Sequence, residues 1–198
     1  MILLQACAVQ SSETVMALSE IPPKTTGVQE FKQGELALLD SAEDEKGKEE
    51  GEVAAFGWVG QMAVTLEETT VYQTLEEAEI SEDELLFPKQ DNTVVLVCNL
   101  NIRNIDASVD ERYGTDSFLI DVFSLRVNAN GCPLMFFSGA VDNSDPKKRL
   151  AYDLEPGDNR TFTLAYCLSQ KDLEDEIYFR VGIANWPEKY KIRLELPS

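Results

Sequence analysis

The sequence contains no histidine. A Ser-His-Asp triad, a Cys-His dyad and any metal site that requires imidazole are therefore excluded. Basic residues are also scarce, because 17 lysines and arginines stand against 36 aspartates and glutamates, so the formal charge of the 198-residue chain is −19. This charge repels phosphate backbones and anionic headgroups, so we expect no nucleic-acid partner and no direct binding to a lipid surface.

Long apolar runs are missing too. No stretch of the sequence approaches the roughly 18 residues that a membrane-spanning helix needs. Hydrophobic residues nevertheless make up 43% of the chain and aromatic residues 9%. That content is enough for a folded core and excludes global disorder, and the length suits one domain with a tail.

The first seven residues resemble the end of a bacterial lipoprotein signal. Leu4 and Ala6 stand at positions −3 and −1 relative to Cys7, whose thiol would receive the lipid. A basic start and a long apolar region are missing, so this hypothesis requires a true start further upstream. The alternative is an ordinary N-terminus with an incidental cysteine. We predict lipid attachment at Cys7 and hence an extracytoplasmic protein, either secreted or held at the cell membrane only by its lipid anchor.

Residues 8–52 are predicted to form a flexible, disordered acidic linker. Between residues 40 and 52, seven acidic residues and two lysines give a net charge of 2 − 7 = −5. Like charges at this density keep a chain extended and solvated. The apolar residues between Phe31 and Leu39 also fit a short docked strand, but we favour a spacer.

From residue 53 onward the hydrophobic residues recur with a period of two. Such alternation occurs in the runs 62–71, 94–102, 118–127, 134–139, 162–168, 177–183 and 192–196. Turn residues separate these runs, for example Asn128–Gly131 and Pro156–Asp158. The pattern predicts an all-β domain over residues 53–198, an antiparallel two-sheet sandwich of about seven to nine strands.

Three details refine this prediction. Val95 and Val97 make the strand at 94–102 apolar on both faces, which favours a central position in its sheet. The inward parity flips near residues 121–122, as a bulge or bend would require. Residues 75–80 and 170–175 have some helical character, and we expect short helices in loops there.

The order of several segments resembles a known family. These segments are Phe56–Trp58, Val94–Asn104, Ser117–Leu125, Asn130–Gly131 and Leu154–Asp158. Over about residues 53–196 the chain resembles uncharacterised immunoglobulin-like domains of Gram-positive surface lipoproteins. The resemblance implies an immunoglobulin-like sandwich, an extracytoplasmic location and a non-catalytic domain, with no ligand to carry over.

The cysteines do not fit a disulfide across the sandwich. Cys98 has the inward parity of its strand and Cys167 has the outward parity, whereas an inter-sheet bridge needs both inward. We expect Cys98 to be a buried free thiol and Cys132, in a turn before Pro133, to be the most exposed. Without histidine or a Cys-x-x-Cys motif, zinc binding is not indicated.

Calcium is the one cofactor that the carboxylates suggest. Four acidic residues crowd one loop: Asp106, Asp110, Glu111 and Asp116. Calcium takes six to eight oxygen ligands and binds extracellular modules weakly. The spacing matches no standard calcium loop, so solvated surface acids are the alternative, and otherwise no cofactor is expected.

Aromatic residues at strand ends or in loops are the remaining candidates for ligand contact. We expect Trp58, which precedes an apolar strand, to plug the core, and Tyr113, Trp186 and Tyr190 to lie at the surface.

Together these features predict a lipid-anchored binding module that is not an enzyme and that binds a protein, peptide or glycan at the cell surface. The alternatives are a carboxylate-based hydrolase acting on glycans and a structural spacer in an envelope assembly.

Overall fold

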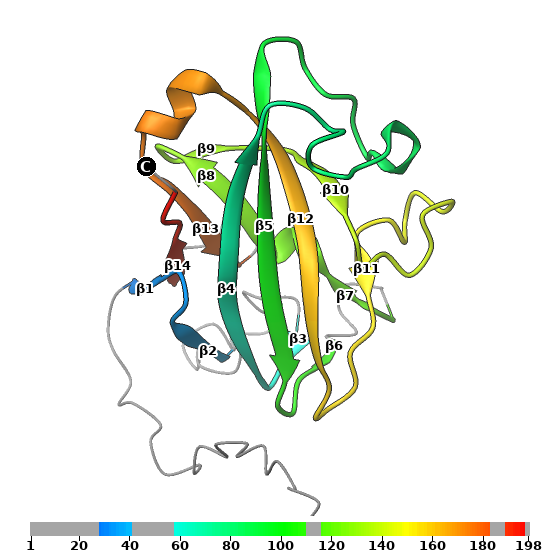
Figure 1. Cartoon of the computed structure of the whole chain (residues 1–198). Helices are drawn as coiled ribbons and strands as arrows, with labels where there is room; N and C mark the ends of the chain where they lie inside the picture. The colour runs from blue at the N-terminus through cyan, green and yellow to red at the C-terminus, as the bar shows by residue number, and fades with distance from the viewer. Residues whose placement is uncertain (1–27, 41–57, 110–115, 183–188, 197–198) are drawn as a thin grey trace, which may run out of the picture.

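The chain folds into two stacked β-sheets (Figure 1). The computed structural model describes residues 28–40, 58–109, 116–182 and 189–196. Within these residues the only helices are three short 3₁₀ turns: η1 (Glu82–Glu84), η3 (Ile120–Val122) and η4 (Gln170–Glu174). None of the helices described has the length and hydrophobicity that a membrane crossing requires.

Each sheet has five strands. The long sheet, in spatial order, contains β10 (Leu134–Phe137), β12 (Asn159–Ser169), β5 (Thr93–Asn104), β4 (Gln61–Tyr72) and β2 (Leu36–Asp40). The short sheet contains β1 (Gln29–Lys32), β14 (Tyr190–Arg193), β13 (Ile177–Val181), β8 (Phe123–Val127) and β9 (Asn130–Gly131). Two small ladders pair β7 (Phe118–Leu119) with β11 (Ala151–Tyr152) and β3 (Trp58–Val59) with β6 (Ser108–Val109). The predicted two-sheet sandwich is thus confirmed.

The main core fills the space between the two sheets. β5 lies at the centre of the long sheet, and its inward residues Leu96, Cys98, Leu100 and Ile102 are fully buried. The largest fully buried side chains of the core are Trp58, Phe123, Tyr152, Phe162, Tyr166 and Phe179. The alternation read from the sequence predicted the inward face of β5 correctly, and the apolar outward residues Val95 and Val97 agree with its central position.

The N-terminal boundary of the domain was predicted wrongly. Residues 28–40, assigned to the flexible linker, form the edge strands β1 and β2 of the two sheets, so the sandwich begins well before residue 53. Between these strands the chain crosses from one sheet to the other, where Gln33 N donates to Arg193 O (3.0 Å) and Gly34 N donates to Leu66 O (2.8 Å). Gly34 makes the turn with a φ of +81°, which glycine adopts without strain. The rest of the predicted linker, at 8–27 and 41–52, lies outside the described residues.

The number of strands and the direction of their pairing also differ from the prediction. The described residues contain fourteen strands, because two edge strands and several two-residue ladders add to the expected set. The sheets are not wholly antiparallel, since β1 runs parallel to β14. A sequence pattern that fits both a docked strand and a spacer does not decide between them, because only docking against the sheet edge buries its apolar side chains.

Local predictions met mixed outcomes. The expected bend near residues 121–122 is present as η3, where the chain passes from the ladder strand β7 to β8 of the short sheet. The helix near residues 170–175 is confirmed as η4. Residues 75–80 form hydrogen-bonded turns instead of a helix, because Glu79 has a left-handed φ of +55° and one turn is too short to nucleate a helix.

Candidate functional site

The surface aromatics predicted from the sequence are not brought together as a site. Tyr190 lies in β14, is only 5% exposed and packs against Phe31 with ring centroids 6.4 Å apart, so its prediction as a surface contact was wrong. Side chains of β14 point alternately to the two faces of the sheet, and Tyr190 lies on the face that points into the core. The register of the strand decides which face that is. Tyr113 and Trp186 lie outside the described residues, as does Cys7. Trp58 is buried and stacks on Phe123, as expected.

The cysteines of the sandwich are free thiols. Cys98, Cys132 and Cys167 form no disulfide, and the absence of a Cys98–Cys167 bridge agrees with the parity of these two residues. Burial raises the pKa of the Cys98 thiol well above its ordinary value. Cys132 packs against the main core and is half-buried, as Cys167 is, so the expectation that Cys132 is the most exposed stays a prediction. Burial is also the main cause that raises the pKa of the Cys132 thiol.

The predicted calcium ligands are only partly described. Asp106 and Asp116 are exposed, whereas Asp110 and Glu111 lie outside the described residues. Asp106 has a structural task, because its Oδ1 accepts a hydrogen bond from Gln61 N (2.7 Å) where β4 begins. Among the residues that the structure places, no three Asp, Glu or Cys side chains form a group suited to a metal ion.

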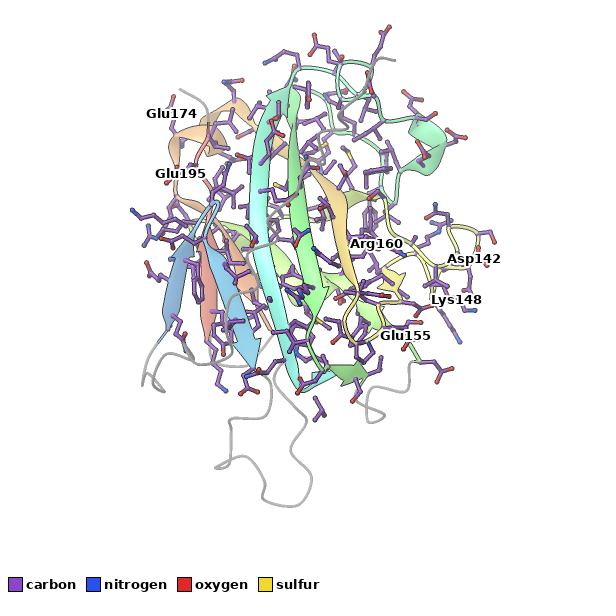
Figure 2. The ribbon with its side chains drawn as sticks, turned by 60° about the horizontal axis from the view of Figure 1, so that its bottom comes forward. Asp142, Lys148, Glu155, Arg160, Glu174 and Glu195 are labelled. Carbon is purple, nitrogen blue, oxygen red and sulfur yellow. The ribbon has the colours of Figure 1, made fainter. Side chains whose placement is uncertain are left out.

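An end depression of about 580 Å³ opens at the end of the sandwich where β6, β7 and the residues after β11 meet. Its wall combines apolar side chains with three exposed carboxylates, Asp116, Asp153 and Glu155. The remaining lining residues are Ala107, Ser108, Val109, Ser117, Phe118, Leu154 and Pro156. Figure 2 shows Glu155 at this end of the molecule. The sequence did not indicate that these three carboxylates meet, because they come from segments almost forty residues apart.

A buried amide holds the end depression together. Asn104, at the end of β5, is fully buried. Its Nδ2 donates to Ala107 O (2.9 Å) and Leu154 O (2.7 Å), and its Oδ1 accepts from Ala107 N (2.7 Å). Because a buried polar group is costly unless its hydrogen bonds are made, this geometry fixes the two loop segments relative to each other.

The second surface feature is the β4–β5 loop, residues 73–92, which folds over the outer face of the long sheet (Figure 1). Beneath it lies a small outer cluster whose buried members are Ile80, Val95, Met135 and Ala165. Partly buried side chains surround them: Tyr72, Leu75, Ala78, Leu85, Val97, Phe136, and Cys167. The β4–β5 loop is thus packed on β5, β10 and β12 by its own apolar contacts.

Hydrogen bonds fix the shape of this loop further. Leu86 N donates to Met135 O (2.8 Å), which ties the loop to the edge strand β10. Ile80 N donates to Leu75 O (3.0 Å) and closes the first turn. Ser81 and Glu84 form a capping box at η1, and Lys89 Nζ donates to Thr93 O (2.7 Å) at the return into β5. The loop therefore has one defined conformation over most of its length.

The β4–β5 loop leaves a groove open at the surface, and most of the residues that line it are apolar. The groove has a volume of about 320 Å³ and is lined by Leu75, Glu82, Leu85, Leu86, Phe87, Pro88 and Lys89. Phe87 belongs to the contiguous apolar run Leu85–Pro88, yet its side chain is 57% exposed. Single exposed apolar residues are ordinary on protein surfaces, but a contiguous patch in a hollow is typical of a binding site.

Sequence reasoning missed this groove. It did not weigh the apolar run that follows the acidic residues 82–84. Two signals could have found it: the run Leu85–Pro88, and the outward-facing Val95 and Val97, which require a cover on the outer face of β5.

Comparison with known proteins adds little. No protein-family model matches the sequence, and no curated protein matches it. One similar solved structure is an uncharacterized β-sandwich protein from Clostridium difficile 630, with 10% sequence identity and a TM-score of 0.35. The match covers 88% of this chain and 100% of that chain. At this level of similarity the likeness carries no argument about function, and the sandwich assignment rests on the sheets described above.

Proposed function

We propose that the chain is a non-catalytic binding module that works outside the cytoplasm and holds a protein partner at the groove of the β4–β5 loop. The single observation that carries the proposal is Phe87, which is 57% exposed in an apolar groove while the loop around it is packed and hydrogen-bonded to the sheet. A surface that is already ordered loses little conformational entropy when it binds, so more of the contact energy appears as affinity.

The main alternatives predict different things of this groove. A structural spacer does not need an exposed aromatic ring in a fixed loop. In a spacer, burial of the Phe87 ring would make the domain more stable without loss of function. A glycan-binding site is typically built from several exposed rings and hydrogen-bonding groups, whereas Phe87 is the one aromatic side chain among the described residues that line this groove. A protein partner fits best, because aromatic side chains in pockets dominate protein interfaces.

The test uses position-specific photocrosslinking. The full chain would carry benzoylphenylalanine in place of Phe87, or as the matched control in place of Val141, which is 42% exposed in the β10–β11 loop. After irradiation with an envelope extract, we expect adducts from position 87 that position 141 does not give. Equal adducts from both positions, or none from position 87, would contradict the proposal and favour the spacer.

The location outside the cytoplasm is supported by the lipobox-like residues before Cys7. The test is metabolic labelling with a fatty acid of the protein expressed from its own gene with the upstream region. We expect label that is lost in Cys7→Ser. Label that persists in Cys7→Ser, or a protein that is never labelled, would refute lipid attachment.

A glycan hydrolase is the second candidate function, because the end depression gathers Asp116, Asp153 and Glu155. Glycosidases use two carboxyl groups across a cleft, one of them normally withdrawn from water, whereas these three are all exposed. Release of reducing sugar from cell-wall glycan that Asp116→Asn or Glu155→Gln abolishes would establish this function. Activity that is absent in the unaltered chain, or unchanged in the variants, would refute it.

Calcium stays a prediction that a thermal melt can test. The full chain would be melted in calcium and in chelator, with Asp116→Asn as the variant. A midpoint that rises with calcium only in the unaltered chain would support the site, and equal midpoints would dismiss it.

A further inference from the structure

We propose that the groove of the β4–β5 loop receives a cationic amphipathic segment of a partner protein, in which lysines or arginines flank one large apolar side chain. This inference rests on the proposed function, because it assigns the chemistry of the partner at the same groove. It combines two observations: the apolar groove itself and the charge of the residues that surround it.

The β4–β5 loop is strongly acidic around the groove. Between residues 75 and 89 there are six acidic residues and one lysine, a net charge of 1 − 6 = −5. All six acidic residues are exposed: Glu76, Glu77, Glu79, Glu82, Asp83 and Glu84. The lysine is Lys89, whose Nζ is held by Thr93 O. Charges of one sign around a concave site raise the local concentration of ligands of the opposite sign.

The groove offers apolar side chains that an occupant can cover. Leu75, Leu85, Leu86, Phe87 and Pro88 line it, and Glu82 is the only acidic residue that the described part of the chain contributes to the lining. A purely ionic ligand would leave this apolar surface in water, whereas a branched or aromatic side chain would cover it. Apolar burial then supplies affinity, and the acidic rim supplies orientation and a fast encounter.

A second copy of this chain is the less suitable occupant. One group of cations close in sequence to an exposed apolar residue is in the β10–β11 loop, where Lys147, Lys148 and Arg149 follow Val141. Asp142 and Asp145 in the same loop reduce its net charge to 3 − 2 = +1. Hydrogen bonds from Ser144 also lower the pKa of the Asp142 carboxyl, which keeps it charged. Two chains of charge −19 repel each other, and this loop offers little compensation.

The test compares two fluorescent peptides by anisotropy on the full chain. Both peptides carry four lysines, and the central pair is Leu-Phe in one and Ala-Ala in the other. We expect the Leu-Phe peptide to bind about tenfold more tightly, since one large apolar side chain is buried. Phe87→Ser should abolish that preference, and Val141→Ser, a matched exposed apolar position, should leave it intact. Equal binding of the two peptides, or equal effects of the two variants, would overturn the inference.

Charge is tested with two double variants of equal net charge. Glu76→Gln with Glu82→Gln removes two negative charges from the β4–β5 loop, whereas Glu174→Gln with Glu195→Gln removes two exposed negative charges from other segments, η4 and the residues after β14. We expect the loop variant to weaken the Leu-Phe peptide about fivefold at low salt and the control variant to have less than half of that effect. Equal weakening would show general attraction to an acidic protein and overturn the inference.

Two further outcomes separate this inference from the proposed function. A position-87 crosslink to a partner whose yield is unchanged in the loop variant would leave the proposed function standing and refute the cationic partner. A dimer in sedimentation velocity that Phe87→Ser dissociates would assign the groove to a second copy of the chain and refute both.

Discussion

The two apolar clusters of this protein differ in how they are built, although β5 contributes to both. In the main core, the two sheets cover each other, and the inward residues of β5 are completely buried. In the outer cluster, one loop covers part of one sheet, with only four buried members. One face of β5 is therefore covered by the opposite sheet, whereas its other face is covered only in part, by a loop.

The outer face of β5 shows where this loop cover ends. Val95 and Val97 lie under the loop, but the next outward residues are Asn99 and Asn101, which form polar pairs with β12. Asn99 Oδ1 accepts from Thr163 Oγ1 (3.1 Å), and Asn101 Nδ2 donates to Thr161 Oγ1 (3.0 Å). The change from valine to asparagine along one face marks the border between a covered and a solvated surface. We expect the covered part to open far more easily than the main core, because it has fewer buried contacts.

The largest expected difference is in thiol reactivity. Cys98 is buried in the main core, whereas Cys167 is half-buried beside the outer cluster, with its Sγ 3.2 Å from Met135 Sδ. Alkylation of Cys98 should require global unfolding, which costs roughly 5–15 kcal/mol in domains of this size, and Cys167 should react through local opening. Peptide-level mass spectrometry after timed alkylation measures both rates. Equal rates would mean that the main core opens locally too.

Truncation of one phenylalanine in each cluster should give the next largest contrast. Phe162 is fully buried between Phe137 and Tyr152, with ring centroids 5.5 and 4.9 Å away, and Phe136 is half-buried in the outer cluster. We expect Phe162→Ala to lower the free energy of unfolding by about 3–5 kcal/mol and Phe136→Ala by about 1–2 kcal/mol. Urea denaturation measures both. Comparable losses would show that the outer cluster is part of the cooperative core.

The buried amide behind the end depression is expected to matter almost as much as a core side chain. Asn104→Ala leaves Ala107 N, Ala107 O and Leu154 O without their partner, which should cost about 2–4 kcal/mol. The control is Asn101→Ala, which loses one half-exposed hydrogen bond and should cost no more than about 1 kcal/mol. Similar costs at the two positions, by urea denaturation, would mean that Asn104 does not brace the two loop segments.

A change under the loop should act locally. Ile80→Ala removes a buried member of the outer cluster, and we expect a cost of about 1–2 kcal/mol that appears as loosening of the β4–β5 loop. Limited proteolysis should then cut within residues 73–92 faster, while the urea midpoint of the sheets changes little. Phe87→Ser is the control, since loss of an exposed ring should change stability by no more than about 0.5 kcal/mol. Unchanged proteolysis in Ile80→Ala would contradict a loop held by this cluster.

Alkaline pH should give the smallest contrast. Burial raises the pKa of the Cys98 thiol, so the folded state holds that proton to a higher pH than the unfolded state does. Its contribution to stability is complete below the unfolded pKa of about 8.5 and declines as the pH rises above it. The loss between pH 7 and pH 9 should be below about 1 kcal/mol. Cys98→Val should lose less stability over that interval, and an identical loss in the variant would refute this cause.

The sequence by itself determined the fold class and most of the main core. Period-two alternation assigned Leu96, Cys98, Leu100 and Ile102 to one face of β5, because side chains of a strand point alternately to opposite faces. The same parity rule predicted that Cys98 and Cys167 do not pair. These features depend only on neighbours along the chain, so they can be read without knowing which strands meet.

Only the tertiary structure decided which strands meet, and the candidate site depends on that. Taken alone, the apolar residues of β1 and β2 also fit a linker, because they become buried only when the two strands pair with the sheet edges. Tyrosine is common at surface contacts, yet the register of β14 directs the side chain of Tyr190 into the core. The outer cluster and the three carboxylates of the end depression bring together segments that are far apart in sequence, and the groove takes its shape within one loop because that loop packs on the outer cluster. Local patterns carry no information about such contacts, because strand pairing and loop docking are fixed by the burial that the whole fold makes available.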